Sequence, residues 1–312
     1  MSVQATYLWF DGELRPWDDG RIHLLTHTLH YGLGVFEGTR AYVQDDGSTA
    51  VFRLDDHLAR LRRSAKILQI DIPFTQQQLH DATVEVIAAN ELTSCYLRHI
   101  AFIGEGAMGL HPQNNPIRTA ILAWPWGAYL GEDGLKKGIR CKISSFVRHF
   151  PNSSMSQAKA TGNYINSIMA KREVVALGYD EAILLDTDGF VAEGSGENIF
   201  IVRDGVIKTP PLASILDGIT RNTVLQIARR RGLTVEQTRI TRDELYIADE
   251  AFFTGTAAEI TPIREVDDRV IGEGRPGPVT QQIQSDYFDL VEGRQVYDPD
   301  WLATVDFTGA TI

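Results

Sequence analysis

Four of the chain's Asp-Gly pairs lie between two apparent β-strands, and these four constrain the fold of this chain most strongly. They are Asp11-Gly12, Asp46-Gly47, Asp188-Gly189 and Asp204-Gly205. An Asp-Gly pair in this setting is a strong local signal for the tight turn of a β-hairpin, because both residues tolerate positive φ. Two pairs lie near the N-terminus and two in the second half, so we expect antiparallel strands in both halves of the chain.

Helical periodicity alternates with these hairpins. Residues 54–70 predict an amphipathic helix with Asp55 or Asp56 as its N-cap. The apolar stripe of this helix is made by Leu54, Leu58, Leu61, Ala65 and Leu68. Further helices are expected over 75–92, 161–178 and 217–232, with Gly178 and Gly232 ending the last two.

These elements indicate an α+β protein with two consecutive domains. We expect a small N-terminal α/β domain over 1–125 and a larger, strand-rich C-terminal domain over 135–312 that carries Lys159. The segment PWGAYLGEDG is rich in glycine and ends in charged residues, so residues 126–134 are the expected linker.

Composition narrows the classes of function. The chain has 312 residues, 43% of them hydrophobic, and a formal net charge of -11 without a basic stripe, which argues against nucleic acid and favours small-molecule partners. The first residues lack a signal-peptide pattern and no apolar run is long enough to span a membrane, so a cytoplasmic protein is expected. Cys95 and Cys141 lie in apparent strands and are expected to be buried thiols.

Lys159 has the most unusual surroundings of the lysines. It lies in SQAKATGNY among small residues, with Gly162 and Tyr164 close behind, which leaves room for a bulky ring near the backbone. An ordinary lysine amine is almost entirely protonated at neutral pH, so a nucleophilic lysine needs burial or a covalent partner such as a Schiff base. On these residues alone a solvated lysine is the more common explanation, and both explanations stay open.

Glu193 ends an apparent strand and precedes a glycine-rich turn. A glutamate in such a place is commonly a solvated turn residue. The functional alternative is a carboxylate beneath a pyridine nitrogen, which keeps that nitrogen protonated so that the ring can accept electrons. Glu197, in the same turn, is equally open to a structural role.

Two turns offer backbone amides to an anion. Gly218, Ile219 and Thr220 open an expected helix, whose unpaired N–H groups and dipole favour negative charge. The turn at 254–257 ends a strand and offers amides and a hydroxyl. Each turn alone is explained as a cap, but together with Arg60 they form a reasonable site for a phosphate dianion.

Two other patterns do not support a site. His23, His27 and His30 have spacings that a metal site uses, but no nearby cysteine or well-placed carboxylate completes a ligand set, so no metal is expected. The run YGLGVFEG is similar to a dinucleotide-binding motif, yet Glu37 stands at the third glycine position and no strand opens a βαβ unit before it.

Seven motifs occur in the order in which one enzyme family carries them. They are HYGLGVFEGTRAY, YLRHIAFIG, PWGAYLG, AKATGNY, VAEGSGENIF, LDGITR and FTGTAAEITP. With them the chain, from about Tyr7 to Tyr287, resembles the fold-type IV enzymes that use pyridoxal 5′-phosphate (PLP), and among these the branched-chain amino acid aminotransferases. The resemblance implies a PLP cofactor and a pseudo-barrel in the C-terminal domain.

The resemblance also implies a role for each matching residue. Lys159 is the Schiff-base and proton-transferring residue, Glu193 pairs with the pyridine nitrogen, and Tyr164 bonds the phenolic oxygen. Phosphate contacts are implied for Arg60, Ile219, Thr220 and Thr256, and ring contacts for Gly196, Glu197 and Leu216. Gly218 is expected to bind the cofactor through the turn described above. The implied substrate pocket consists of Tyr31, Phe36, Gly38, Leu110 and Tyr129, with Tyr96, Ala257 and Ala258 at the α-carboxylate.

Arg98 matches a family arginine that contacts the substrate. An enzyme working between leucine and glutamate must accept a branched apolar chain and a γ-carboxylate in one pocket, and aromatic walls with an arginine at the edge suit both. A surface strand arginine is the alternative. His99 and Asp217 stand where family members carry proline, and the effect of His99 on the neighbouring Arg98 stays open.

The implied reaction is a ping-pong transamination of leucine, isoleucine and valine with 2-oxoglutarate, giving branched 2-oxo acids and L-glutamate. A D-amino acid or (R)-amine transaminase or an aminodeoxychorismate lyase of the same fold type is the nearest alternative, and a non-enzymatic acidic binding protein is a more distant one. Tyr31, Tyr96 and Arg98 together favour the L-branched-chain reaction. The resemblance also implies a homo-oligomer, at least a dimer, in which Tyr31 and Leu110 reach a neighbour; the sequence does not distinguish dimer from hexamer.

Overall fold

The computed structural model describes residues 5–127 and 129–308, which divide into two compact units. Within this range the first unit holds residues 5–126, Ala158–Gly162 and 290–308, and the second holds the remainder. This differs from the two consecutive domains expected from the sequence. The segment around Lys159 groups with the first unit because backbone hydrogen bonds attach it to a strand there, and the final residues add a strand to the same sheet.

The first unit is built on an antiparallel sheet with the strand order β16-β4-β3-β5-β6-β1-β2. The strands are β1 (Tyr7–Phe10), β2 (Glu13–Pro16), β3 (Gly34–Val43), β4 (Thr49–Phe52), β5 (Cys95–Ile103), β6 (Ile117–Trp124) and β16 (Leu302–Thr304). Two hairpins predicted from Asp-Gly pairs, β1–β2 and β3–β4, are confirmed. Asp11 and Gly12 make the first turn with φ of 52° and 100°.

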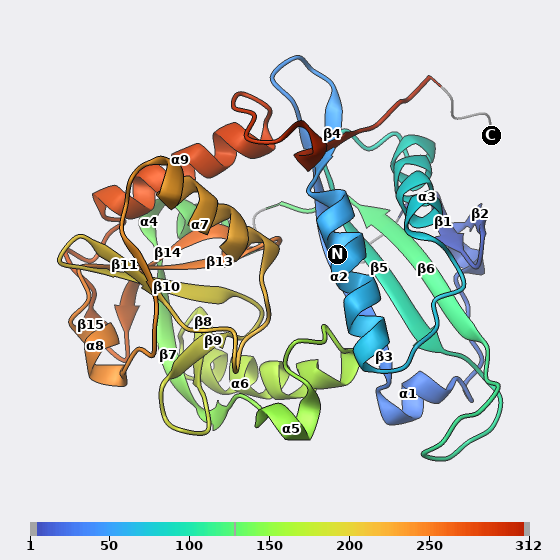
Figure 1. The fold of residues 1–312 in the computed structure, drawn as a ribbon, viewed down its shortest axis with the longest axis horizontal. Helices are drawn as coiled ribbons and strands as arrows, with labels where there is room; N and C mark the ends of the chain where they lie inside the picture. Colours follow the sequence, from blue (N-terminus) through green and yellow to red (C-terminus); the bar gives the residue numbers. More distant parts are fainter. Residues whose placement is uncertain (1–4, 128, 309–312) are drawn as a thin grey trace. The chain divides into compact units, whose positions relative to one another are not determined.

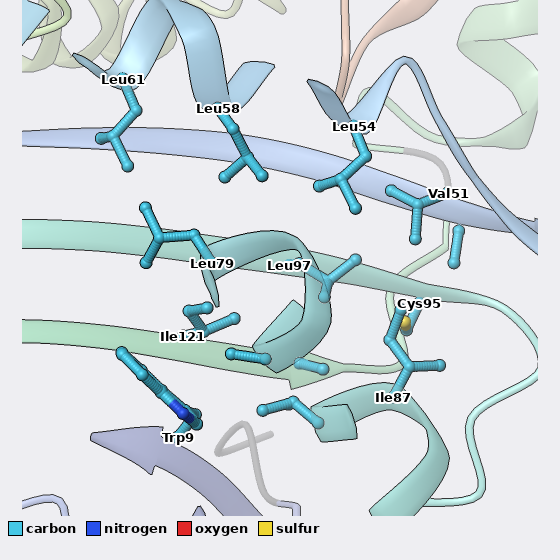
Figure 2. Packing of buried hydrophobic residues seen from close by; sticks show 14 of the residues in the cluster. Trp9, Val51, Leu54, Leu58, Leu61, Leu79, Ile87, Cys95, Leu97 and Ile121 are labelled. Carbon is cyan, nitrogen blue, oxygen red and sulfur yellow. The ribbon is translucent and has the colours of Figure 1, made fainter. Parts of the chain in front are cut away.

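Two helices, α2 (Leu54–Ile67) and α3 (Gln76–Ala89), cover one face of this sheet (Figure 1). Leu54, Leu58 and Leu61 of α2 are fully buried against the strands, as the predicted stripe requires. Figure 2 shows them packing with Leu97 of β5 and Ile121 of β6. This core fixes the rotation of α2 about its axis, and therefore fixes which of its polar residues face the sheet.

The predicted N-cap of α2 is wrong. Arg53, in a left-handed conformation with φ of 53°, takes that position, and Asp55 and Asp56 lie in the first turn. The helix begins at Leu54, as the predicted range has it, so the two aspartates lie inside the helix and cannot cap it. Asp56 instead accepts a hydrogen bond from Arg53 Nε at 2.6 Å. The negative charges of Asp55 and Asp56 stabilise the helix, because they lie at the positive end of its dipole.

Strands of the second unit form a closed ring. The strands are β7 (Ile139–Val147), β8 (Glu181–Leu185), β9 (Val191–Gly194), β10 (Asn198–Arg203), β13 (Glu250–Gly255) and β14 (Glu259–Val266). Neighbours pair in the order β10-β13-β14-β7-β8-β9, and β9 pairs again with β10. The strands β11 (Val206–Thr209), β12 (Val235–Gln237) and β15 (Arg269–Val270) extend the sheet. This is the pseudo-barrel expected from the resemblance, and the hairpins at Asp188-Gly189 and Asp204-Gly205 are confirmed.

Helices of the second unit include the two that were predicted, α6 (Tyr164–Ala176) and α7 (Ile219–Arg230), followed by Gly178 and Gly232 at positive φ. The others are α4 (Glu132–Lys137), α5 (Pro151–Ser154), α8 (Arg242–Tyr246) and α9 (Pro278–Val291). Because α4 begins at Glu132, the last three residues of the expected linker are helical. None of the helices in the described residues is both long and apolar enough to cross a membrane.

Cys95 and Cys141 are free and buried, as expected. Burial raises the pKa of the Cys95 thiol to about 12. Cys141 lies in β7, where burial and the nearby acids also raise its pKa. Both residues therefore act as small apolar side chains in their cores.

Candidate active site

Lys159 lies in a short extended segment that is added to the open edge of β3. The Phe36 N–H donates to the Lys159 carbonyl at 3.1 Å, and an isolated antiparallel bridge follows one residue along. The edge is available because β4 pairs only with Ala41–Val43. From α2, the Ser64 hydroxyl accepts the Lys159 N–H at 3.0 Å. Sheet and helix thus fix the Lys159 backbone, and its Nζ lies 4.9 Å from the centroid of the Phe36 ring.

Two glycines let the chain turn away from this segment. The Gly162 N–H donates to the Gly32 carbonyl at 3.0 Å, and a Cβ on Gly162 would lie 3.1 Å from that oxygen. Gly32 itself has a φ of 73°, which favours glycine. This close backbone contact explains why position 162, three residues after Lys159, is a glycine.

Arg60 is buried on α2, one turn before Ser64, and forms a bidentate ion pair with Glu37 of β3. Its Nε and Nη2 donate to the two carboxylate oxygens at 2.6 and 2.9 Å, and His57 Nδ1 lies 2.8 Å from the second oxygen. Burial alone raises the pKa of Glu37, but the Arg60 guanidinium and the hydrogen bonds from Arg60 and His57 outweigh it and hold that pKa well below its ordinary value. Glu37 is therefore a charged residue in the core, and α2 places Arg60 near the anchor of Lys159.

His99 lies on the helix-facing side of β5, so its ring is not beside the Arg98 side chain. Successive side chains of a strand point to opposite faces. His99 Nε2 is 2.9 Å from the hydroxyl of Thr83 on α3. Burial lowers the pKa of His99 to about 3, so the imidazole is neutral at physiological pH. The histidine that stands here in place of the family's proline therefore has its side chain on the face of β5 opposite to that of Arg98.

Phe36, Gly38, Tyr96 and Arg98 share the opposite face of β3 and β5. In the antiparallel register Gly38 lies across from Arg98. The Arg98 Cζ is 4.5 Å from the Phe36 ring centroid and 5.7 Å from that of Tyr96. Position 38 must lack a side chain, because a Cβ there would lie 1.8 Å from the Tyr96 hydroxyl oxygen. The structure brings these four predicted residues together.

Arg98 has the features of an anion-binding group. Its Nε is buried and has no hydrogen-bond partner within the described part of the chain. A buried donor without a partner costs free energy, and a carboxylate would satisfy it. The aromatic rings on which the guanidinium rests supply apolar surface beside this charge.

Tyr31 and Leu110 lie on the surface of the first unit. Leu110 is 91% exposed between β5 and β6, and Tyr31 is 46% exposed at the end of α1 (His27–Tyr31). His27 joins these elements, because its Nε2 is 2.7 Å from the Gly109 carbonyl oxygen and its ring centroid is 4.5 Å from that of Tyr31. The two predicted residues thus belong to one exposed surface.

Glu193 and Asn198 close the ring of strands in the second unit. They pair across β9 and β10, and the Asn198 amide donates to Glu193 Oε2 at 3.2 Å and to the Leu216 carbonyl at 3.0 Å. The Leu216 N–H donates to the same Oε2 at 3.2 Å. Arg148 Nη2 lies 2.8 Å from Glu193 Oε1. Glu193 is therefore a buried carboxylate with a fixed orientation, not a solvated turn residue.

Two residues of this cluster were not predicted from the sequence. Asn198 lies within the quoted motif VAEGSGENIF, where a buried amide could have been sought as the partner of the glutamate. Arg148 follows a strand far from Glu193 in sequence, and nothing in its local pattern pointed to the pair. Strand pairing in the closed ring brings them together.

The turn that the sequence offers for a phosphate lies at the start of α7, and its contact with a phosphate stays a prediction. Gly218 is the N-cap, no side chain caps the helix, and no acidic residue lies in its first turn. Ile219 and Thr220 are buried. A Cβ on Gly218 would lie 1.9 Å from Asn198 Oδ1, so glycine lets this turn pack against the residue that orients Glu193.

The second predicted turn, with Thr256, Ala257 and Ala258, connects β13 to β14. At its start Thr254 lies opposite Asn198 in the register. The Thr254 hydroxyl is buried and lacks a hydrogen-bond partner within the residues described. The structure thus gathers both turns and Glu193 around Asn198.

Glu197 lies beside Gly196 with its carboxyl group turned into the core. The Gly196 N–H donates to Glu197 Oε2 at 3.0 Å. Burial, followed by repulsion from buried Glu181, raises the pKa of Glu197 to about 8. Lys171 neutralises part of the cluster, with its Nζ 2.6 Å from Glu181 Oε2. The protonated form of the Glu197 carboxyl is therefore favoured at neutral pH in the folded chain. Its predicted contact with the cofactor ring stays a prediction.

Two predicted tyrosines lie in the second unit. Tyr164 is the first residue of α6. Tyr129 is 39% exposed, and its ring centroid is 5.7 Å from Lys171 Nζ. Their contacts to a cofactor or substrate stay predictions.

The residues fit the chemical parts of PLP. The first unit supplies a lysine and a buried arginine held by one helix. The second supplies a buried carboxylate for the pyridine nitrogen and a helix start without a side-chain cap for the phosphate. The Thr254 hydroxyl, which lacks a partner within the described residues, is a further hydrogen-bond donor. Thr254 lies opposite Asn198, the residue that bonds the Glu193 carboxylate. No group of at least three His, Cys, Asp or Glu side chains among the described residues could hold a metal ion.

Comparisons with known proteins identify the family. The model of amino-transferase class IV matches residues 34–266. A branched-chain-amino-acid aminotransferase of Pseudomonas aeruginosa is 53% identical over 98% of this chain and 99% of its own length. The crystal structure of the Escherichia coli branched-chain amino acid aminotransferase has a TM-score of 0.95 at 44% identity, covering 97% of this chain and 100% of that one. The T.th. branched-chain amino acid aminotransferase complexed with N-(5'-phosphopyridoxyl)-L-glutamate has a TM-score of 0.94 at 45% identity, covering 98% and 100%. This chain belongs to the class IV aminotransferases.

Membership confirms the fold type and the cofactor predicted from the sequence. The chain has the fold-type IV architecture and uses PLP. The roles of individual residues stay predictions.

The buried Glu197 predicts a pH dependence of stability. Its pKa is about 8 in the folded chain and near 4.5 when exposed, so the unfolded state releases the proton first as pH rises. The free energy of unfolding of wild type, relative to Glu197→Gln, should therefore fall between pH 5.5 and 8, by at most about 1.4 kcal/mol per pH unit. Denaturant titrations at several pH values measure this difference.

Glu236→Gln, at an exposed strand position, is the matched control, and its difference from wild type should not change with pH. A Glu197→Gln difference that is constant or rises with pH would show that Glu197 is ionised in the folded protein.

Proposed function

We propose that this chain transfers amino groups between branched-chain L-amino acids and 2-oxoglutarate. Relatives named branched-chain-amino-acid aminotransferase are 44% to 53% identical over almost the whole chain. Structures of the T.th. relative hold 4-methylvaleric acid in one case and N-(5'-phosphopyridoxyl)-L-glutamate in another. The first ligand has a branched apolar chain and the second carries glutamate, the two kinds of side chain that the proposed reaction requires.

The observation that carries the proposal is the surface formed by Phe36, Tyr96 and Arg98. Two aromatic rings flank a guanidinium whose Nε is buried without a partner in the described residues. A branched aliphatic chain gains free energy by burial against the rings. The γ-carboxylate of 2-oxoglutarate instead pairs with the guanidinium. One surface can therefore accept both substrates of the cycle.

The remaining roles follow from the charges of the residues. PLP, when bound, supplies an electron sink for negative charge that develops at the substrate Cα. Lys159 binds the cofactor through Nζ and then moves the Cα proton. Glu193, oriented by Arg148 and Asn198, holds a proton at the pyridine nitrogen. Arg60 and the first turn of α7 bind the phosphate.

Exposed apolar side chains support a homo-oligomer with at least two copies. In the first unit they gather on α1 and the adjacent loops, at Ile22, Leu24, Leu25, Leu29, Tyr31, Met108 and Leu110. In the second they follow one stripe of α6, at Ile165, Ile168, Met169 and Val175. Such surface is normally covered by a partner. Light scattering after size-exclusion chromatography should give a dimer or larger, and a monomer at micromolar concentration would contradict the proposal.

We also infer a cytoplasmic location. The two free, buried cysteines suit a reducing compartment. Fractionation of cells that produce the protein should recover it in the cytoplasmic fraction, and recovery with the membranes or outside the cell would overturn the inference.

The proposed function is tested by half-reactions of the PLP-loaded protein. L-Leucine and L-glutamate should each convert the cofactor absorbance to that of its amine form, because Arg98 and its aromatic neighbours serve both side chains. D-Alanine and (R)-1-phenylethylamine should leave the spectrum unchanged. A faster reaction with either of these two would support the alternative transaminases instead.

Arg98→Ala should separate the two substrate classes. Loss of a charge-assisted contact to the γ-carboxylate should lower kcat/KM for L-glutamate and 2-oxoglutarate by about ten- to hundredfold, with L-leucine changed by less than about threefold. Arg118→Ala is the matched control, because Arg118 also lies over an aromatic ring of the same sheet, 4.6 Å from the Phe10 centroid. Equal losses for leucine and glutamate would show that Arg98 is structural.

A further inference from the structure

Glu37 is a buried charge that the proposed reaction does not use directly. Its side chain is fully inaccessible, and it faces α2 from β3. It stands at the third glycine position of the run that resembles a dinucleotide motif. Burying a carboxylate is costly unless it is paired and hydrogen-bonded, so its pairing with Arg60 and His57 must be a fixed part of the fold.

The ion pair determines which edge of the Arg60 guanidinium can reach an anion. A guanidinium offers two bidentate edges, a side edge with Nε and one terminal nitrogen, and an end edge with both terminal nitrogens. Glu37 occupies the side edge, with bonds of 2.6 and 2.9 Å. Any bidentate contact of Arg60 to a phosphate must therefore use the end edge.

The same helix links this orientation to Lys159. Arg60 and Ser64 are four residues apart on α2, hence on one face of the helix. Ser64 accepts the Lys159 N–H at 3.0 Å. The plane of the guanidinium and the backbone of Lys159 are thus set by one rigid element, and Glu37 removes the remaining freedom of the arginine side chain.

We propose that Glu37 is a positioning residue that holds the Arg60 guanidinium for the phosphate of the cofactor. The inference rests on the proposed function, because it takes Arg60 as a phosphate ligand. His57 assists by bonding Glu37 Oε2 at 2.8 Å. Two effects of Glu37 oppose each other. Its negative charge weakens the attraction of Arg60 for phosphate, whereas its bidentate contact prevents a flexible side chain from adopting other rotamers.

The orientation effect is the larger of the two. A bidentate contact requires both N–H groups at the correct angle, and charge-assisted hydrogen bonds weaken steeply when misaligned. Glu37→Gln keeps the size of the side chain but cannot accept two hydrogen bonds from the guanidinium in the same way. The guanidinium should lose its fixed plane although its own charge stays.

The test uses full-length apoprotein and two non-covalent ligands, pyridoxamine 5'-phosphate and pyridoxamine, which differ only in the phosphate. Affinities are measured by calorimetry or fluorescence titration. Glu37→Gln should weaken pyridoxamine 5'-phosphate by about ten- to hundredfold and pyridoxamine by less than about twofold. Unchanged or tighter binding of the phosphate ligand, or equal weakening of both ligands, would overturn the proposal.

Asp286→Asn is the matched control. Asp286 is also buried and also forms a bidentate pair, with Arg231 at 2.8 and 2.5 Å, but neither residue belongs to the candidate site. This variant should bind both ligands like wild type. A comparable phosphate-specific loss in it would show that the effect of Glu37→Gln is general destabilisation.

Arg60→Lys keeps the test decisive if Glu37→Gln does not fold. Lysine retains the positive charge opposite Glu37 but lacks the fork. The same phosphate-specific loss is expected, and wild-type affinity would show that charge alone suffices. A wild-type apoprotein that binds neither ligand would contradict the proposed function itself, which is a different outcome from a failure of the Glu37 proposal.

Discussion

The hydrogen bond from the Phe36 N–H to the Lys159 carbonyl is the interaction on which the first half of the candidate site depends. It adds a segment from the second half of the sequence to the free edge of β3, and Ser64 on α2 completes the anchor. Because α2 also carries Arg60, the lysine and a candidate phosphate ligand are fixed by the same packed helix. The buried leucines that orient α2 therefore help to place both candidate residues.

In the second unit the corresponding constraint is the closure of the strand ring. β9 and β10 meet at Glu193 and Asn198, and the amide of Asn198 reaches both the carboxylate and the backbone before α7. Glu193, the candidate partner of the ring nitrogen, is thus hydrogen-bonded to the segment that leads into the candidate phosphate turn. A charged group at the seam of a barrel is costly, and Arg148 provides the compensating charge.

Local elements of this fold can be predicted from the sequence because their signals are local. Asp-Gly turns give the hairpins, the leucine stripe gives α2, and the glycines after α6 and α7 give their ends. The N-cap of α2 is mispredicted because the helix already includes Leu54, so that both aspartates lie in its first turn and Arg53, in a left-handed conformation, takes the cap position. Domain assignment of Lys159 differed because strand addition joins residues far apart in sequence.

The candidate site shows the same difference between local signals and contacts that only the fold creates. Motifs predict Lys159, Glu193 and Arg98 as site residues. In the sequence, however, Glu37 is only a mismatch to a glycine motif, and Arg148 has no distinguishing local pattern. Both are buried charges whose meaning appears only when another charged side chain is placed beside them.

In the proposed reaction Lys159 binds the cofactor, and every other role assigned to the candidate site depends on this bond. Borohydride reduction of the PLP-loaded protein, followed by proteolysis and mass spectrometry, locates the attached group directly. We expect a single phosphopyridoxyl group on Lys159, in the peptide that contains AKATGNY. A group attached to another lysine such as Lys171 or Lys208, or no attached group on any lysine, would contradict this claim.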